Sequence, residues 1–354
     1  EGGKIFGSGS RTPISITLLV MNPESKSEKA TIHYHDIGDY LDREEKLKII
    51  KGFYSFANLA FPLNPIRPNE HGDWVSMRNA AFDNFIPLDP DRNFDIKTDT
   101  FFVTQNPGLL SGREPWVYNY NNDGLAFNMS RMISFYEQQR LYFIKANATK
   151  KIPVNDFVDG NPQNISWTVN LKKDIERNKQ YEFDKSCIQI AIYRPFTKQL
   201  LYFHKPFIER PGGSTLFFPN SLLKNIVICV SGVGASKDNC IYITNIPIDY
   251  NALDAGAKCF PLYYYEENNS IQKGMFDSDD EQKYIRRDAI SDFILERAKK
   301  QYGKNVTKED IFYYVYGFLH SNEYRETFAN DLKKMLPRLP LVEDVRDFWA
   351  FSKA

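Results

Sequence analysis

The segment Ser231-Gly-Val-Gly-Ala-Ser-Lys-Asp-Asn239 combines small residues with polar side chains that can contact nucleic acid. It lies between two stretches whose residues favour strands, so we expect a loop. Glycines let backbone N–H groups approach phosphates, while hydroxyl, ammonium, carboxylate and amide groups can reach base edges in the major groove. The pattern predicts a DNA-contacting loop, although a hairpin tip that touches only water has the same composition. The predicted contact residues are Ser231, Ser236, Lys237, Asp238 and Asn239.

Arginines and lysines elsewhere provide further candidates for DNA contacts. Arg113 stands in Ser111-Gly-Arg-Glu-Pro-Trp116, where Gly and Pro constrain the chain in a pose suited to bidentate contact with guanine. An arginine buried against Glu114 or an aromatic ring fits the same segment equally well. Arg194, in Tyr193-Arg-Pro-Phe196, is expected to form a structural ion pair or a phosphate contact, with Phe196 in the core. Weaker phosphate candidates are Arg78, Lys198, Arg210 and Lys224.

The motifs of several catalytic reactions are missing or incomplete. Adenine methyl transfer uses an Asn/Asp-Pro-Pro-aromatic loop, and the Asn-Pro pairs of this chain lack the second proline and the aromatic residue. The glycines near Gly7 do not form a site for S-adenosylmethionine, and the segment that ends at Lys237 lacks the spacing of a P-loop. Glu281-Gln-Lys283 lacks a second paired acid for a nuclease, and His33 with His35 lacks a third metal ligand. We therefore expect no catalysis, metal or cofactor in this chain.

The composition is that of an ordinary globular chain without net charge. Its 354 residues contain 45 Lys and Arg and 45 Asp and Glu. This balance argues against a protein whose whole surface is basic and binds nucleic acid. Residues 185–240 contain seven Lys and Arg but two acids, a block that predicts either a one-sided DNA face or ordinary solvated surface. The four cysteines lack the spacing of a zinc site, which favours a reducing cytoplasm, and no apolar run is long enough to cross a membrane.

A mixture of strands and helices must position these residues. Strand-like stretches at 14–20 and 30–35 predict a hairpin, and helical spacing follows toward residue 53. Later strands and helices do not alternate as βαβ units. We therefore expect an α+β fold with mixed or antiparallel sheets and packed helices in two lobes, and a helical C-terminus. The predicted divisions are 1–53, 54–150 as the first lobe, 151–270 as the second lobe, and 271–354 as the helical region.

Local signals predict where individual elements begin and end. Strands are expected at 100–104 and 116–120, and a helix at 128–146 with Asn128 as its cap. Near the C-terminus, apolar residues recur at helical spacing on both sides of Ser321. This pattern predicts two short helices, the second of which begins at Ser321 as its N-cap.

The amino-acid sequences of several segments resemble those of the Type ISP restriction-modification enzymes. The segment 311–341, which includes Tyr-Val-Tyr-Gly-Phe-Leu-His-Ser-Asn-Glu-Tyr-Arg, resembles the C-terminal region of that family. The segments 106–119, Tyr193-Arg-Pro-Phe196 and Pro261-Leu-Tyr263 are also similar to it. Near the start of the chain, residues 6–20 resemble the last strands of the family's methyltransferase domain.

The resemblance implies a target-recognition domain that reads an asymmetric duplex DNA site and presents an adenine to a neighbouring N6-adenine methyltransferase domain. It implies that residues 1–53 end that methyltransferase domain and that the chain, which begins at Glu1 without a methionine, is part of a longer polypeptide. The implied partners are duplex DNA and the methyltransferase and translocase domains, and S-adenosylmethionine, Mg²⁺ and ATP would belong to domains outside this chain. The alternative is a scaffolding module that docks other domains without reading DNA.

Overall fold

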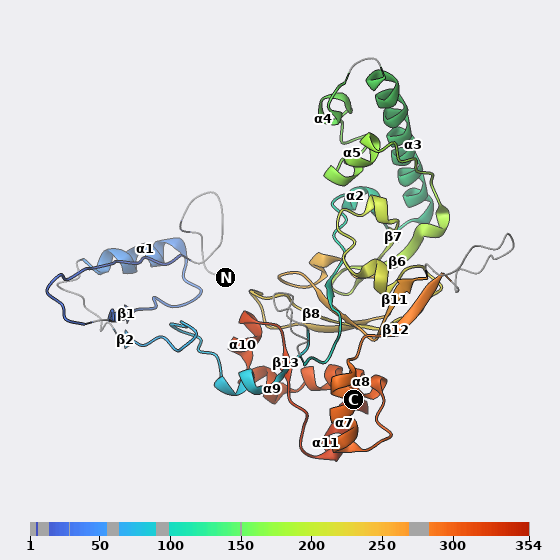
Figure 1. Ribbon diagram of the computed structural model, residues 1–354. Helices are drawn as coiled ribbons and strands as arrows, with labels where there is room; N and C mark the ends of the chain where they lie inside the picture. The colour runs from blue at the N-terminus through green and yellow to red at the C-terminus, as the bar shows by residue number, and fades with distance from the viewer. Residues whose placement is uncertain are drawn as a thin grey trace. The chain divides into compact units, whose positions relative to one another are not determined.

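The computed structural model of the protein describes residues 5, 14–27, 29–54, 64–89, 99–148, 151–268 and 283–353. The chain forms two compact units, Glu1–Met77 and Arg78–Ala354 (Figure 1). Within the described ranges, no helix is long and apolar enough to cross a membrane. The divisions expected from the sequence near residues 53, 150 and 270 stay predictions.

The first unit contains one helix and a two-stranded sheet. Helix α1 (Arg43–Gly52) begins at a capping box, in which the Asp42 carboxylate accepts from the Glu45 N–H and the Glu45 carboxylate accepts from the Asp42 N–H. Strand β1 (Ile32–Tyr34) pairs antiparallel with β2 (Asn64–Ile66). None of the residues of α1 is buried, and the buried core residues among the described parts of the chain all belong to the second unit.

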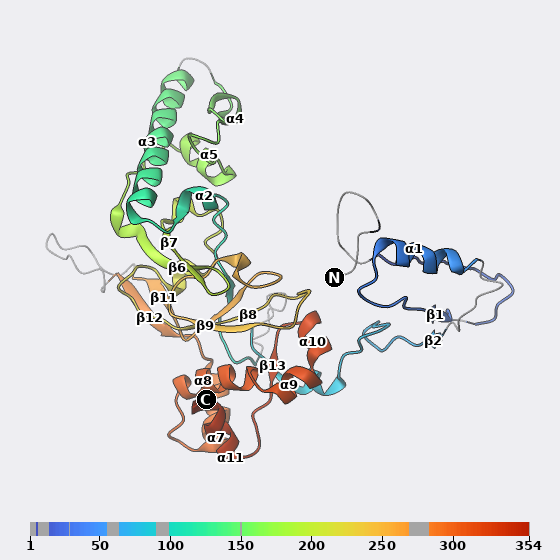
Figure 2. The same ribbon diagram turned by 180° about the vertical axis from the view of Figure 1, so that it is seen from behind.

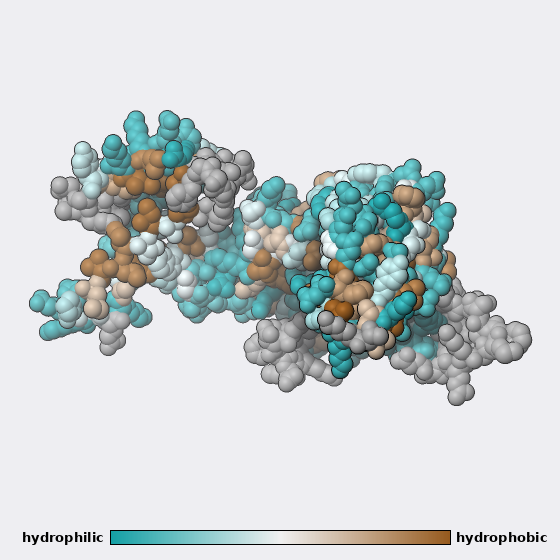
Figure 3. All heavy atoms as spheres, turned by 90° about the horizontal axis from the view of Figure 1, so that it is seen from above, coloured by the Kyte–Doolittle hydropathy of each residue, from teal (hydrophilic) through white to brown (hydrophobic). Residues whose placement is uncertain are grey.

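The predicted hairpin between 14–20 and 30–35 is wrong. Residues 14–20 form no strand, and β1 pairs with the more distant β2. Strand propensity is a local property, whereas the choice of partner depends on segments far apart in the chain. Figure 3 shows hydrophobic residues, coloured brown, at the surface of this unit on the left. The exposed apolar residues of 14–21 are Ile14, Ile16, Leu18, Leu19, Val20 and Met21.

The second unit is centred on a four-stranded sheet in the order β4–β10–β8–β9, with each neighbouring pair antiparallel. Strand β8 is buried along its whole length. Because side chains alternate across a strand, Ile228 and Val230 enter one core while Val227 and Cys229 enter another. The strands are β4 (Asn106–Pro107), β8 (Val227–Val230), β9 (Ile241–Thr244) and β10 (Lys258–Pro261).

The C-terminal helices form the first of these cores, on one side of the sheet (Figures 1 and 2). The Ser321 hydroxyl accepts from the Tyr324 N–H at 3.3 Å, so the predicted cap is confirmed. The helix predicted after Ser321 divides at Phe328 into α9 and α10. The helices are α7 (Asp292–Tyr302), α8 (Lys308–Leu319), α9 (Asn322–Thr327), α10 (Ala329–Lys334) and α11 (Val345–Lys353).

A lobe on the other side of the sheet combines helices with a three-stranded antiparallel sheet in the order β5–β7–β6 (Figure 1). The predicted strand 116–120 is wrong in part, because Trp116 and Val117 belong to α2. Helix α3 begins earlier than predicted, with Asn121 as its cap. The elements are α2 (Glu114–Val117), β5 (Tyr118–Asn119), α3 (Asn122–Asn147), α4 (Val154–Phe157), α5 (Val169–Glu176), β6 (Ile188–Arg194) and β7 (Thr197–Tyr202).

The α+β fold class with a helical C-terminus is confirmed. The predicted strand 100–104 is not formed, since Phe102 makes an isolated bridge to Ile290. Short elements complete the second unit: η2 (Ala80–Asn84), β3 (Ile86–Pro87), η3 (Lys185–Cys187), η4 (Lys205–Phe207), α6 (Ser214–Phe217), η5 (Tyr250–Ala252), β11 (Tyr263–Glu267), β12 (Tyr284–Asp288) and β13 (Arg338–Leu339).

Candidate nucleic-acid interface

The loop 231–239 between β8 and β9 is partly folded into the protein. Ser231 is 4% exposed, and its hydroxyl accepts from the Cys240 N–H at 3.0 Å, which closes the base of the loop. Asn239 is also buried, and its carbonyl accepts from the Arg325 guanidinium at 3.2 Å. The predicted contact residues that face solvent are Ser236, Lys237 and Asp238. Three of the five residues are therefore accessible, and their contacts with DNA stay predictions.

Asp254, in the turn before β10, holds the tip of this loop. Its Oδ2 accepts from the Ser236 N–H at 2.7 Å, from the Ser236 hydroxyl at 2.9 Å and from the Lys237 N–H at 3.1 Å. These hydrogen bonds, above all the one from the Ser236 side chain, lower the pKa of Asp254 and keep it ionised at neutral pH. The backbone at Lys237 is held in place while its side chain remains exposed.

Helix α10 supports the loop at a second point. The Gly234 N–H donates to the Lys333 carbonyl at 2.9 Å, and the φ of Gly234 is +83°, which glycine adopts without strain. The Lys333 ammonium lies 3.8 Å from the exposed Asp238 carboxylate, a pair that contributes little to stability. Lys333 of α10 thus lies beside Asp238, the residue that follows Lys237 in the loop.

The turn between β6 and β7 lies beside the turn that carries Asp254. Pro195 and residues 250–256 line an open pocket of ≈ 400 Å³. At the base of the hairpin, the Arg194 guanidinium donates to the fully buried Asp249 at 2.8 Å, so the predicted ion pair is present. Phe196 is 87% exposed, and its predicted place in the core is wrong, because the turn points it outward.

Arg113 lies in the interior and not at the surface. It is 1% exposed, and its Nη2 donates to the Thr168 hydroxyl at 2.7 Å. Desolvation lowers the pKa of Arg113 to about 10, against the opposing effect of the nearby Glu209 carboxylate. Among the described residues, Nε and Nη1 of Arg113 and Oε2 of Glu209 are buried without a hydrogen-bond partner. In this position the guanidinium does not face solvent, which favours the buried alternative, although its neighbours are Thr168 and Glu209 and not Glu114 or an aromatic ring.

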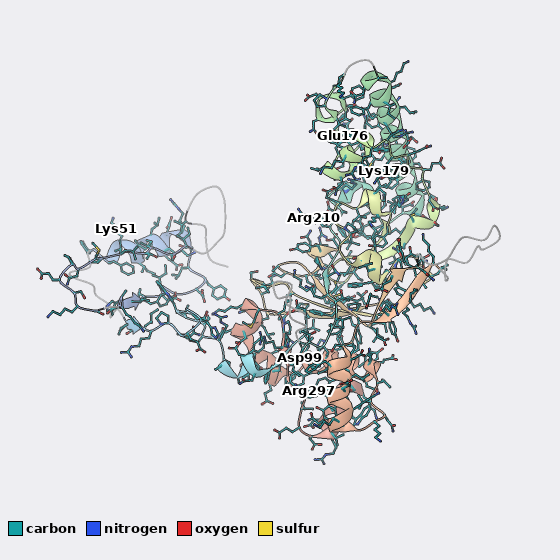
Figure 4. All side chains as sticks on the ribbon, viewed as in Figure 1. Lys51, Asp99, Glu176, Lys179, Arg210 and Arg297 are labelled. Carbon is teal, nitrogen blue, oxygen red and sulfur yellow. The ribbon has the colours of Figure 1, made fainter. Side chains whose placement is uncertain are left out.

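The remaining predicted cations are spread over the second unit. Lys198, Arg210 and Lys224 are exposed. Figure 4 shows Arg210 between the α2–α5 lobe and the sheet that contains β8. Arg78 is half-buried; burial raises the pKa of Asp331, and the charge of Arg78 opposes that rise. Ser236, Lys237 and Asp238 therefore share one exposed loop tip. The cations predicted to bind phosphates lie in other segments of the second unit.

Two candidate sites for metal-dependent chemistry have different outcomes. In the described part of the chain, no three His, Cys, Asp or Glu residues are grouped to hold a metal ion, so His33 and His35 gain no third ligand there. Glu281, from the candidate nuclease segment, lies outside the described residues.

Sequence reasoning missed Asp254 and Lys333 and placed Phe196 in the core, whereas its side chain is exposed. Asp254 and Lys333 reach the loop from distant segments, and nothing in their own neighbourhood signals this contact. Phe196 had a usable signal, because proline favours the first central position of a turn, which places the next residue at the turn tip.

Comparisons with known proteins identify the family. The model of the Type ISP C-terminal specificity domain matches residues 100–354, and no curated protein matches the chain. Among solved structures, a nuclease-deletion mutant of the Type ISP restriction-modification enzyme LlaGI in complex with a DNA substrate mimic is 32% identical, with a TM-score of 0.78. This similarity covers 99% of the present chain and 30% of the LlaGI chain.

Two further structures are similar. The ATP-dependent Type ISP restriction-modification enzyme LlaBIII bound to DNA is 29% identical, with a TM-score of 0.74 over 92% of this chain and 20% of that one. The DrdV–DNA complex is 26% identical, with a TM-score of 0.73 over 91% of this chain and 30% of that one. The present chain thus spans 20–30% of the length of these proteins. Since the family model covers most of its residues, the chain belongs to the family of Type ISP C-terminal specificity domains.

Proposed function

We propose that this chain reads a target site in duplex DNA. The observation that carries the proposal is the loop 231–239, whose exposed tip is held by Asp254 and α10. The similar structures of LlaGI, LlaBIII and DrdV contain DNA or a mimic of a DNA substrate, which supports DNA as the ligand. As a specificity domain, the chain binds DNA without catalysing a reaction itself.

In this proposal, the loop tip reads base edges and scattered cations bind phosphates. Ser236, Lys237 and Asp238 together offer hydrogen-bond donors and acceptors, which the major groove requires for direct readout. Ser231 and Asn239 shape the loop from its buried base. Phosphate contacts orient the domain without carrying sequence information. The candidates for these contacts are the exposed Lys198, Arg210, Lys224 and Lys333, together with the half-buried Arg78 and with Arg194, whose guanidinium also binds Asp249.

The resemblance extends the proposal to a longer polypeptide. We infer that the first unit ends an N6-adenine methyltransferase domain and that the second unit presents the target adenine to it. The exposed apolar residues of 14–21 support this inference, because neighbouring strands would cover them. The methyltransferase and translocase domains would be the protein partners, and S-adenosylmethionine, Mg²⁺ and ATP would be bound outside this chain.

Selection from a randomised duplex pool, followed by fluorescence anisotropy at two salt concentrations, tests the proposal. Affinity should fall with salt, because each phosphate contact releases counterions. Lys237→Ala should relax the enriched motif at one position, at a cost of about 1–3 kcal/mol. Lys224→Ala, the matched control from a separate segment, should weaken all sequences alike. Absence of binding at low salt would contradict the proposal and favour the scaffolding alternative.

A further inference from the structure

The turn between β6 and β7 exposes an aromatic ring. Phe196 is 87% exposed and follows Pro195 in a two-residue turn, since Arg194 pairs with Thr197 across the hairpin. Single exposed apolar residues are common on protein surfaces. Exposure alone therefore does not identify a functional site. The backbone conformation of Phe196 and the residues around it give further evidence.

The backbone of Phe196 is strained. Its φ is +60°, in the left-handed region where the Cβ atom crowds the following carbonyl oxygen. Turns with proline in the first position usually have Gly or Asn in the second when φ is positive there. A phenylalanine at this point lowers stability, and its ring gains little burial in return. Strain of this kind gathers at functional positions, so its presence motivates a functional hypothesis.

The hairpin that carries Phe196 is firmly held. The Ile192 N–H donates to the Pro247 carbonyl, and the Asp249 N–H donates to the Ile192 carbonyl, both at 2.8 Å. The buried Asp249 carboxylate accepts from Arg194 at 2.8 Å and from the Tyr118 hydroxyl at 3.3 Å. These contacts join the hairpin to the segment that leads to Asp254. The ring therefore projects from a rigid support.

The ring also lies next to the candidate DNA loop. Its centroid is 6.3 Å from that of Tyr242, in the strand that follows the loop 231–239. Pro195 shares a pocket with Asp254, which in turn binds the backbone of Lys237. Aromatic side chains near a loop that binds nucleic acid can stack on its bases.

We propose that Phe196 is an apolar wedge that enters the base stack of bound duplex DNA. The inference rests on the proposed function, because it requires DNA on the loop 231–239. Phenylalanine is one of the residues that proteins insert between base steps, where it partly unstacks the neighbouring bases. Every base offers a π-face, so the ring adds affinity at one step without reading a particular sequence.

The test compares Phe196→Gly with Phe196→Trp and Phe127→Ala in the 354-residue chain. Phe127, on α3, is 65% exposed and controls for the loss of an exposed ring. Glycine removes the ring and relieves the left-handed strain, so Phe196→Gly should melt at a temperature equal to or above that of the wild type. It should nevertheless bind the enriched duplex about 5- to 150-fold more weakly, the range for loss of one base–aromatic stack. Phe196→Trp and Phe127→Ala should stay near the wild type, and Phe196→Asn serves as a second ringless variant.

Duplexes with 2-aminopurine at successive positions give an independent readout, since the fluorescence of this base rises when it unstacks. The wild type and Phe196→Trp should raise the signal at one step, whereas Phe196→Gly and Phe196→Asn should not. If the wild type binds and the ringless variants keep both its affinity and its signal, the wedge is overturned and the proposed function stands. If the wild type binds no duplex, the proposed function itself fails.

Discussion

Arg113 provides the sharpest test of which residues build the scaffold and which read DNA. Its guanidinium is 1% exposed, donates to Thr168 at 2.7 Å and lies near Glu209, so we assign it to the scaffold. Arg113→Ala should strongly destabilise the fold. The paired substitution Arg113→Met with Glu209→Gln removes both charges and nearly keeps both side-chain lengths, and it should restore most of the lost stability.

The magnitude follows from the burial of the charge. Desolvation lowers the pKa of Arg113 to about 10, which corresponds to a cost of about 3 kcal/mol for keeping the cation inside the folded protein. Below that pKa, Arg113 is charged in both the folded and the unfolded chain, so the cost is constant at ordinary pH.

Arg113→Ala removes this cost but has three larger consequences. It leaves a cavity, breaks the hydrogen bond to Thr168 and leaves Glu209 without its nearby cation. The cavity and the lost hydrogen bond together should destabilise the fold by about 3–5 kcal/mol. The double variant should lie within about 1–2 kcal/mol of the wild type, because methionine refills most of the cavity and neither position then carries a charge.

Urea unfolding followed by circular dichroism measures these differences. Selection from the randomised duplex pool, carried out with the double variant, then shows whether readout depends on Arg113. We expect the wild-type motif. A double variant that is as stable as the wild type but has lost its preference at one base position would refute the scaffold assignment and restore the predicted guanine contact.

Two further predictions concern stability. Gly256 has φ +83° and faces the ring of Tyr250, so Gly256→Ala should destabilise by about 2–4 kcal/mol through strain and overlap. Gly234→Ala, at the same φ but in open space, should lose only about 1–2 kcal/mol, and equal losses in urea unfolding would contradict the overlap. Burial lowers the pKa of His204, so the unfolded chain takes up a proton before the folded chain does, and stability should fall as the pH drops from about 7 to about 5. His204→Gln should flatten this slope in urea unfolding at several pH values, with His320, whose pKa burial also lowers, accounting for part of the remainder; an unchanged slope would exclude His204 as a contributor.

Local signals predicted helix ends better than strand partners. Ser321 caps α9 as expected, because capping depends on residues within one helical turn. The segment 14–20 had similar local evidence for a strand, yet β1 pairs with β2. Trp116 is a second residue whose local strand propensity gave a wrong prediction. Its aromatic side chain suits a strand, but Pro115 occupies the first turn of α2, where proline fits well.

Residue type predicted which side chains could contact DNA, but it did not predict which of them reach the surface. Arg113 and Ser231 carry suitable groups and are buried, because segments distant in the chain pack around them. Asp254 was overlooked for the same reason, since its role arises from a turn that folds back onto the loop. Phe196 was assigned to the core from its apolar character, whereas the turn geometry turns it to solvent.

A net charge of zero suits a domain that must discriminate between sequences. Nonspecific affinity grows with the number of neutralised phosphates, so a domain with few grouped cations binds random DNA weakly. Here Lys333 lies beside the Asp238 carboxylate, and the Asp254 carboxylate binds the backbone of Lys237. These two negative charges reduce the positive potential around the lysines. Discrimination then depends on geometry. If the loop reads bases as proposed, its attachment to Asp254 would leave it little freedom to adapt to a wrong base, and a small number of contacts would then suffice to select a site.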